Sequence, residues 1–275
     1  MKTAICQNII YGDKEQNLKK AEESIKKAAD KGAELVILPE MFVCEFIPEI
    51  MRKNAEGDNG ETISRLSGSA KENGVWLIGG TFPETDKNVN GKETDGNNTD
   101  FPVYYNTCPI FSPEGKLAAK YRKQHLFDVN VSEGGLKINS TESDLFTPGS
   151  DDIVFDTGAL KIGVAVCFDL RFPELFARMR DSGAELVVIP AAFSAATGPA
   201  HWELLLRARA VDNRYFTAGA GAVSAHNAKY RTYAHSLAAD PWGNVIASAG
   251  EDETVLLFDI DRDRIREVRK QMKLV

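Results

Sequence analysis

Residues 160–174, LKIGVAVCFDLRFPE, decide how this chain is organised. Their alternating aliphatic residues predict a buried strand that runs into Cys167, and Phe172-Pro173-Glu174 then opens a segment with helical spacing. A strand-to-helix turn lifts a thiol to the sheet edge, and a helix N-terminus favours its thiolate. We therefore interpret Cys167 as a candidate nucleophile. The alternative is a structural cysteine, since free cysteines are among the most often buried residues.

A duplicated unit lies on either side of this stretch. KGAELVILPE at 31–40 and SGAELVVIPA at 182–191 share Gly-Ala-Glu-Leu-Val, a proline near the end and a preceding helical segment. The repeat predicts two pseudo-symmetric halves, each contributing a sheet, with the two sheets packed face to face and helices outside. The copies differ at their ends, because Glu40 in the first corresponds to Ala191 in the second.

Helical and strand-like segments alternate along the chain, which predicts an α/β fold in a single domain over residues 1–275. DKNVNGKETDGNNTD at 86–100 is polar, so we expect a surface insertion at about 84–102. Residues 128–148 read as a second irregular stretch, of the kind that often serves function. A charged C-terminal helix is expected at about 261–273, on the surface or against a partner.

The composition is that of a globular enzyme, with 43% hydrophobic and 27% charged residues among 275. A net charge of −7 argues against nucleic-acid binding, and no apolar run is long enough to span a membrane. Four cysteines stand far apart, which suits a reducing compartment rather than a disulfide framework. Because Met1 leads directly into a strand-like run without a signal peptide, we expect a cytoplasmic protein.

Two further candidate residues lie at strand ends. Glu40 closes a short apolar strand, where α/β sheets tend to place ligand sites; the alternative is an exposed carboxylate at the start of a loop. In AKYRKQHLFD at 119–128, strand alternation places Tyr121 and Lys123 on one face and Arg122 on the other. The alternative there is a basic cluster on a solvated strand end.

A thiol, a carboxylate and an ammonium suffice for acyl transfer through a thioester without a metal. The carboxylate acts as base, and the ammonium with a backbone N–H stabilises the oxyanion. A Cys–His hydrolase is the competing interpretation. The histidines have no diagnostic sequence relation to Cys167, although sequence distance does not exclude contact. They are His125, His201, His226 and His235. No metal-ligand spacing and no nucleotide-binding glycine loop is present.

Three separated motifs resemble the nitrilase, or carbon–nitrogen hydrolase, superfamily over essentially the whole chain. They are LPEMF at 38–42, KYRKQHLFD at 120–128 and GVAVCFDLRFPE at 163–174. The resemblance implies a four-layer αββα sandwich, a catalytic Glu-Lys-Cys triad at Glu40, Lys123 and Cys167, and no cofactor. It further implies a homodimer or higher homo-oligomer, formed through the region that bears Cys167.

Two more segments look most like the omega-amidase branch, PAAFSAATGPAHWELLLRARAVDNR at 190–214 and DPWGNV at 240–245. Members of that branch deaminate the ω-amide of 2-oxoglutaramate or 2-oxosuccinamate. Glu142 looks like the second glutamate of the family, which positions substrate and lysine. With Lys123, the Phe168 backbone N–H would hold the oxyanion.

A dicarboxylate monoamide also needs a cation for its distal carboxylate, and Arg171 is a candidate, with Thr197 adding a hydroxyl donor. Alternatively, Arg171 forms an ion pair with Asp169 or Glu174.

The resemblance leaves other activities open. An N-carbamoyl amine or amino acid hydrolase and a nitrilase would use the same triad, and a catalytically silent dimeric scaffold would use the same fold. The chain departs from the omega-amidase branch through its insertion at 86–100 and through extra residues at 131–136. Both changes could reshape the mouth of the pocket, so they bear on the substrate more than on the class of reaction.

Overall fold

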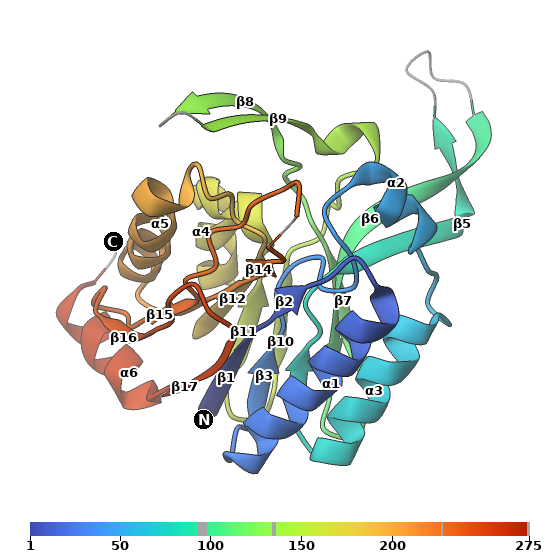
Figure 1. The fold of residues 1–275 in the computed structure, drawn as a ribbon. Helices are drawn as coiled ribbons and strands as arrows, with labels where there is room; N and C mark the ends of the chain where they lie inside the picture. Colours follow the sequence, from blue (N-terminus) through green and yellow to red (C-terminus); the bar gives the residue numbers. More distant parts are fainter. Residues whose placement is uncertain (93–97, 134–135, 227, 274–275) are drawn as a thin grey trace.

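The structure, a computed structural model, describes residues 1–92, 98–133, 136–226 and 228–273. Two β-sheets pack face to face, and helices cover their outer faces (Figure 1). This arrangement confirms the predicted αββα sandwich.

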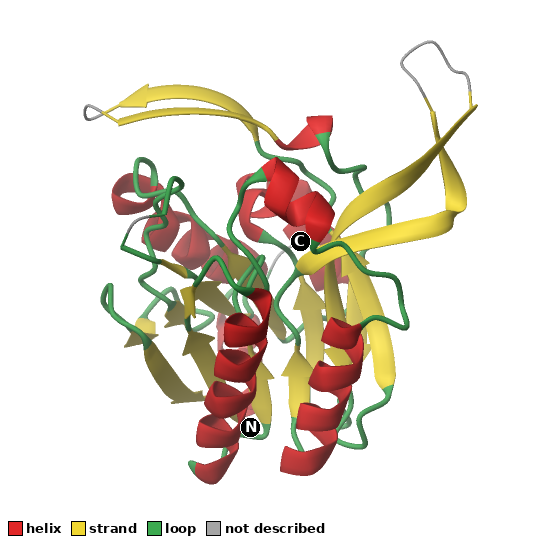
Figure 2. Cartoon of the chain, turned by 45° about the vertical axis from the view of Figure 1, so that its right-hand side comes forward, coloured by secondary structure: helices red, strands yellow, loops and turns green. Residues whose placement is uncertain are grey.

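The first sheet has seven strands in the order β17-β1-β3-β4-β6-β5, with β7 paired to β6. Helices α1 (Lys14–Asp30) and α3 (Glu61–Asn73) run along its outer face (Figure 2), and α2 (Pro48–Lys53) lies near one end. The strands are β1 (Lys2–Gln7), β3 (Leu35–Ile37), β4 (Trp76–Ile78), β5 (Phe82–Lys92), β6 (Asn98–Phe111), β7 (Leu117–Arg122) and β17 (Thr254–Asp259).

The second sheet has six strands in the order β10-β11-β12-β13-β15-β16. They are β10 (Ile153–Asp156), β11 (Lys161–Val164), β12 (Leu186–Ala191), β13 (Phe216–Gly221), β15 (Leu237–Ala239) and β16 (Val245–Ser248). Helices α4 (Pro173–Asp181) and α5 (Gly198–Asn213) accompany this sheet, and α6 (Arg262–Gln271) follows β17. A short pair, β2 (Ile9–Ile10) and β14 (Val223–Ser224), links the two halves.

The apolar run of β3 is explained by burial on both of its faces. Leu35 and Ile37 share one core cluster with Ile162 of the second sheet, so they point into the interior of the sandwich. Val36, between them, belongs to a second cluster with Leu18 of α1, so it points toward the covering helices. A strand buried on both faces needs a continuous apolar sequence, as parallel sheets in α/β proteins do.

The two halves repeat each other down to individual hydrogen bonds. Glu34, in the first copy of the duplicated unit, accepts a hydrogen bond of 2.7 Å from the Lys2 backbone N–H. Glu185, in the second copy, accepts the equivalent bond of 3.0 Å from the Lys161 N–H. β3 pairs in parallel with β1 and β12 pairs in parallel with β11, so each glutamate ties its strand to the preceding one. The predicted pseudo-symmetry is confirmed.

Two hairpins project from the body of the sandwich (Figure 2). One consists of β5 and β6 and takes up most of the expected insertion at 84–102; residues 93–97 lie outside the described part. The other consists of β8 (Asp128–Glu133) and β9 (Leu136–Thr141), so the expectation of an irregular stretch is wrong over 128–133 and 136–141. Partly buried Val129 and Val131 alternate with exposed Asn130, which is the pattern of a strand. This alternation is short and lies in a mostly polar segment, so the strand was not predicted from the sequence.

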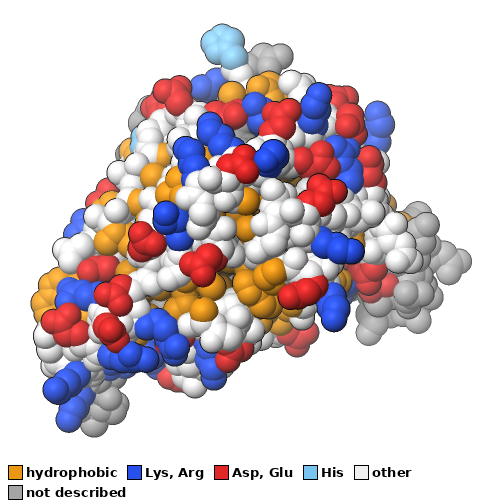
Figure 3. All heavy atoms as spheres, turned by 90° about the horizontal axis from the view of Figure 1, so that it is seen from below, with side chains coloured by type: hydrophobic (Ala, Val, Ile, Leu, Met, Phe, Trp, Pro, Cys, Tyr) orange, Lys and Arg blue, Asp and Glu red, His pale blue; other side chains and the backbone are white. Residues whose placement is uncertain are grey.

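The C-terminal segment and the surface complete the fold. Helix α6 buries Ile265 and Val268. On the face of the molecule shown in Figure 3, acidic and basic side chains are interspersed. Across the described ranges, every helix is too short or too polar to cross a membrane.

Candidate active site

Cys167 stands at a sharp turn after β11. The strand ends at Val164, and a five-residue 3-10 helix, η2 (Cys167–Arg171), precedes α4. The α-helix begins at Pro173, where the sequence predicts it, and the 3-10 helix separates it from Cys167. Cys167 has a φ of 45°, in the left-handed region that residues other than glycine rarely adopt. Such strained positions occur where the surrounding contacts fix them.

Asp169 supplies those contacts. Its fully buried carboxylate accepts hydrogen bonds from the Val166 N–H (2.9 Å), the Tyr121 hydroxyl (2.7 Å) and the His125 N–H (2.9 Å). The Nδ1 atom of His125 also lies 2.7 Å from Asp169 Oδ1. Asp169 thus joins the turn that carries Cys167 to the residues on either side of Lys123.

Lys123 is 1% exposed and lies between two carboxylates. Its Nζ atom is 3.0 Å from Glu40 Oε1 and 2.8 Å from Glu142 Oε2. Burial disfavours the charged ammonium, but the charges of Glu142 and Glu40 outweigh that effect and raise the pKa of Lys123 well above its usual value. Lys123 is therefore a fixed positive charge inside the protein.

Glu40 follows β3 and is held by the other half of the molecule. Its Oε2 atom accepts a hydrogen bond of 2.8 Å from the Ala192 N–H, at the end of β12. The Cys167 thiol is hydrogen-bonded to the same carboxylate. Burial and the neighbouring Glu40 charge raise the pKa of this thiol, with Lys123 opposing them, so the resting group is neutral. The expectation that a helix N-terminus would favour the thiolate is wrong.

Glu142 opens a short 3-10 helix, η1 (Glu142–Asp144), directly after β9. Besides the Lys123 ammonium, its carboxylate accepts the Phe127 N–H at 2.6 Å. Burial raises the pKa of Glu142, and Lys123 counteracts that effect. The structure therefore brings Glu40, Lys123, Cys167 and Glu142 into one buried group.

The sequence interpretation missed Asn106, which belongs to the same group. Its Nδ2 atom donates to Glu40 Oε1 at 2.9 Å and to Glu142 Oε1 at 3.1 Å. The signal that could have found it is its place in β6: a polar residue of low strand propensity in the run YYNTCPIF. Asp169 was considered only as an ion-pair partner, not as a support for the turn.

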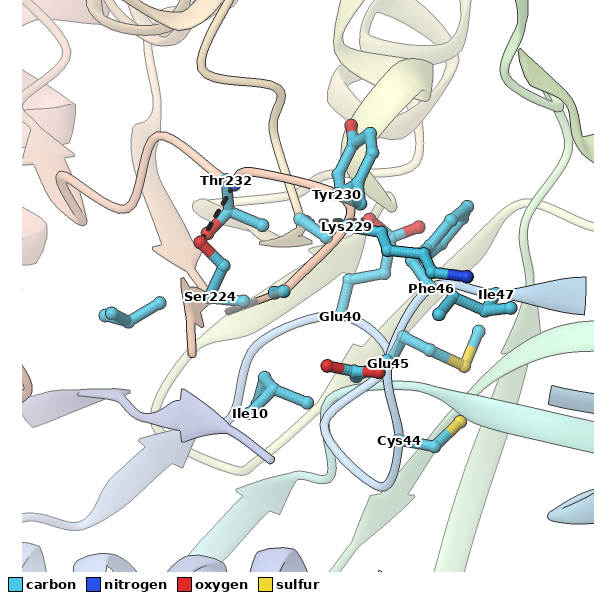
Figure 4. Close-up of a pocket in the computed structure, with 15 residues that line it drawn as sticks. Ile10, Glu40, Cys44, Glu45, Phe46, Ile47, Ser224, Lys229, Tyr230 and Thr232 are labelled. Carbon is cyan, nitrogen blue, oxygen red and sulfur yellow. Dashed lines mark hydrogen bonds between the residues drawn. The ribbon is translucent and has the colours of Figure 1, made fainter. Parts of the chain in front are cut away.

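A small pocket opens beside Glu40 (Figure 4). Its volume of about 30 Å³ is enough for a water molecule. The loop with Lys229 and Tyr230 lies along one side, and the Tyr230 ring is 5.6 Å from that of Phe46. Burial raises the pKa of Tyr230 well above its usual value.

The predicted substrate-binding residues Phe168, Arg171 and Thr197 lie outside the lining of that pocket. Arg171 Nη1 is 3.2 Å from His201 Nδ1, and its guanidinium lies 5.2 Å from the centre of the Phe193 ring. Within the described ranges no carboxylate is within ion-pair distance of Arg171, so the alternative pairing with Asp169 or Glu174 is not found. Burial lowers the pKa of Arg171.

The Phe168 ring lies beside this cation, with its centre 5.7 Å from the Arg171 guanidinium. The Phe168 ring packs edge-on against Phe127, with the two ring centres 5.2 Å apart. Thr197 is 8% exposed, and its hydroxyl has no hydrogen-bond partner among the described residues. In that same part of the chain, no three His, Cys, Asp or Glu side chains converge to hold a metal ion.

The chain is similar over nearly its whole length to known hydrolases. The family model for carbon-nitrogen hydrolases matches residues 2–270. The chain is 42% identical to an omega-amidase NIT2 of Xenopus tropicalis, covering 98% of this chain and 92% of that protein. It is 40% identical to the human omega-amidase NIT2, covering 98% and 91% respectively.

A solved structure shares the architecture. Nit3 of Saccharomyces cerevisiae, described as a member of branch 10 of the nitrilase superfamily, superposes with a TM-score of 0.86 at 33% identity. The match covers 100% of this chain and 95% of Nit3. Family model, relatives and fold agree over nearly the full length, and the chain belongs to the carbon-nitrogen hydrolase family.

Proposed function

We propose that this hydrolase cleaves the ω-amide of a small 2-oxo dicarboxylate monoamide, such as 2-oxoglutaramate or 2-oxosuccinamate, with release of ammonia. The observation that carries the proposal is the buried group in which a thiol, two carboxylates and an ammonium meet. The relatives named omega-amidase, at 40–43% identity, favour an ω-amide over other amides.

Acylation begins at the hydrogen bond between Cys167 and Glu40. Glu40 takes the thiol proton as sulfur attacks the amide carbonyl, and the C–O π electrons move onto oxygen. Lys123 and the Phe168 backbone N–H hold the resulting oxyanion. When the tetrahedral species collapses, the C–N bond breaks, and Glu40 passes its proton to the departing nitrogen, which leaves as ammonia.

Deacylation uses the same carboxylate. Glu40, again ionised, takes a proton from a water molecule whose oxygen attacks the thioester carbonyl. The C–S bond breaks, the acid leaves, and the thiolate recovers the proton from Glu40. The pocket beside Glu40 has room for that water next to its base. Glu142 keeps Lys123 in place throughout, through its 2.8 Å contact with Nζ.

Arg171 is proposed to bind the distal carboxylate of the substrate. It has no carboxylate partner among the described residues, and burial makes its positive charge costly, so an anionic ligand would relieve that cost. The unpartnered hydroxyl of Thr197 is proposed as a second donor.

Ammonia release from a panel of substrates tests this proposal. The purified enzyme should act on 2-oxoglutaramate or 2-oxosuccinamate with a kcat/KM at least about tenfold above that on carbamoyl amines and nitriles. Preference for a carbamoyl compound or a nitrile would assign a different activity to the same triad. Absence of turnover on the whole panel, together with an unreactive Cys167, would indicate a silent scaffold.

Three broader features belong to the proposal. We propose that residues 1–275 act as one hydrolase domain, with β17 completing the sheet that contains β1. We also propose a homodimer built through the region of Cys167, for which light scattering is the test. Four buried free cysteines support a reducing, cytoplasmic location.

A further inference from the structure

We propose that Asn106 is a positioning residue that keeps the mobile proton of the reaction on Glu40 and away from Glu142. The inference builds on the proposed roles of Glu40 and Cys167. It does not depend on which amide is the substrate.

Asn106 is built into the centre of the buried group. It is 1% exposed, and its backbone carbonyl accepts the Lys123 N–H at 2.9 Å, which fixes it beside the ammonium. Its Nδ2 group has two hydrogens, and its contacts of 2.9 and 3.1 Å give one to each carboxylate. One amide therefore connects the two groups that compete for the same proton.

The two carboxylates differ in what surrounds them. Within the described ranges, every hydrogen bond to the Glu142 carboxylate comes from an N–H donor: Lys123, the Phe127 backbone and Asn106. A protonated Glu142 would have to turn its own O–H toward one of these donors, which is unfavourable. Glu40, in contrast, touches Cys167, and a thiolate formed there accepts the proton back. The donor arrangement thus favours Glu40 as the proton carrier.

Removal of Asn106 affects the two carboxylates unequally. Glu142 Oε1 has a hydrogen bond from Asn106 and from no other group in the described part of the chain. Glu40 Oε1 keeps its 3.0 Å contact with Lys123 when the amide is lost. Without Asn106, Glu142 Oε1 is free to carry a proton, which neutralises Glu142 and weakens its hold on Lys123.

Other titratable and charged groups face this cluster. They include Arg171, four residues after Cys167, and Glu45, Lys229 and Tyr230, which line the pocket beside Glu40. On the neighbouring position of β6, Thr107 contacts Glu84, which binds Lys120 and Arg122. Substitution of Asn106 leaves all of these side chains in the protein.

The experiment measures the pH dependence of kcat/KM and of Cys167 alkylation by iodoacetamide in Asn106→Ala. The acid limb of both profiles should move up by about one pH unit, because a donor that favours ionised carboxylates has been removed. At pH 7, kcat should fall roughly tenfold to a hundredfold with KM changed less than about threefold. Unshifted profiles would overturn the proposal, whatever the loss of kcat.

A double-mutant cycle locates the effect. In a Glu142→Gln background the second carboxylate can no longer take a proton, so adding Asn106→Ala should shift the alkylation profile clearly less than it does in the parent enzyme, with only the bond to Glu40 being lost. An equal shift in both backgrounds would overturn the proposal. Asn106→Ser, which leaves a smaller hole and keeps one donor, should shift the profile in the same direction but less. It provides the test if Asn106→Ala does not fold.

Asn213→Ala is the matched control. Asn213 is 2% exposed, and its Nδ2 atom donates to the Arg209 carbonyl at 2.9 Å, away from the two carboxylates. It should lower Tm without moving either pH profile, so a shift in this variant would count against a specific role for Asn106. Alkylation needs no amide substrate, so a wrong substrate assignment leaves this test intact.

Discussion

The Glu40 carboxylate accepts a hydrogen bond of 2.8 Å from the backbone N–H of Ala192, so the end of β3 is held by the end of β12. These two strands carry the duplicated sequence of the molecule. The first copy therefore supplies the carboxylate that we propose as the base, and the residue directly after the second copy supplies the backbone N–H that orients it.

Replacement of Glu40 by Gln should abolish most turnover while leaving the fold intact. The amide keeps the shape of the carboxylate but does not accept the proton of Cys167, and loss of a general base costs about 10²–10⁴ in kcat. Steady-state ammonia release and circular dichroism measure the two effects. A kcat within tenfold of the parent enzyme would show that another group is the base.

Cys167→Ala should have no measurable turnover and an unchanged fold, because the residue that carries the acyl group is gone. Cys108→Ala is the control, since Cys108 is a fully buried core thiol outside the site, and burial raises its pKa well above the usual value. It should retain activity, and mass spectrometry should find iodoacetamide on Cys167 before Cys108. Amide hydrolysis by Cys167→Ala would contradict the thioester mechanism.

Arg171→Met should raise KM for 2-oxoglutaramate by roughly 10- to 100-fold. The variant loses a charge-assisted hydrogen bond to the distal carboxylate, and such a bond contributes about 1.5–3 kcal/mol to binding. A neutral amide without the distal carboxylate should be hydrolysed equally by both enzymes. Arg178→Met serves as control, because Arg178 pairs with Asp152 on the surface and its side chain is 51% exposed. Equal KM values for the parent enzyme and Arg171→Met would remove Arg171 from the substrate site.

Asp169→Asn should disturb the turn of Cys167 more than the overall stability. One oxygen of Asp169 becomes an amide donor, which then faces either the Val166 N–H or the His125 N–H, both donors themselves. We expect kcat to fall by at least about tenfold with a smaller change in KM. A structure of the variant with Cys167 unmoved and kcat unchanged would show that Asp169 does not position it.

Glu84 should make stability depend on pH in the acidic range. Burial disfavours its charge, but bonds from Arg122, Lys120 and Thr107 outweigh burial and lower its pKa to about 2. The folded-state pKa lies below the usual Glu value, so this contribution is present above about pH 4.5 and is lost as pH falls toward 2.

Comparison with Glu84→Gln isolates that contribution. The variant should be destabilised by roughly 3 kcal/mol at pH 7, because the cations around it lose a buried partner. The difference in Tm between the two proteins should shrink as pH falls from about 4.5. A difference that stays constant down to pH 2.5 would show that Glu84 does not contribute in this way.

The sequence was most informative where a local pattern determines the position of a side chain. The duplicated unit distinguished Glu40 from Ala191, and strand alternation placed Lys123 beside Tyr121 on the buried face. These inferences need only the period of a strand and a comparison of two copies. The layers of the fold followed from the same patterns.

Contacts between distant segments were beyond the reach of these patterns. Asp169 meets Tyr121, and Asn106 meets Glu142, across 48 and 36 residues of sequence, and neither pairing has a local signature. The β8–β9 hairpin was missed because its polar composition outweighed a short alternation. The φ of Cys167 depends on its bond network, so the local sequence did not reveal it.

The pairing of β1 with β17 has a consequence for how the chain is made. Lys2 lies opposite Asp259, so β1 can pair with β17 only after all of the sequence between them has been synthesised. Until then β1 has an open edge, which is a site for pairing with other chains. Folding that depends on such distant contacts is slow, and we expect translation speed and chaperone supply to control the yield of active enzyme.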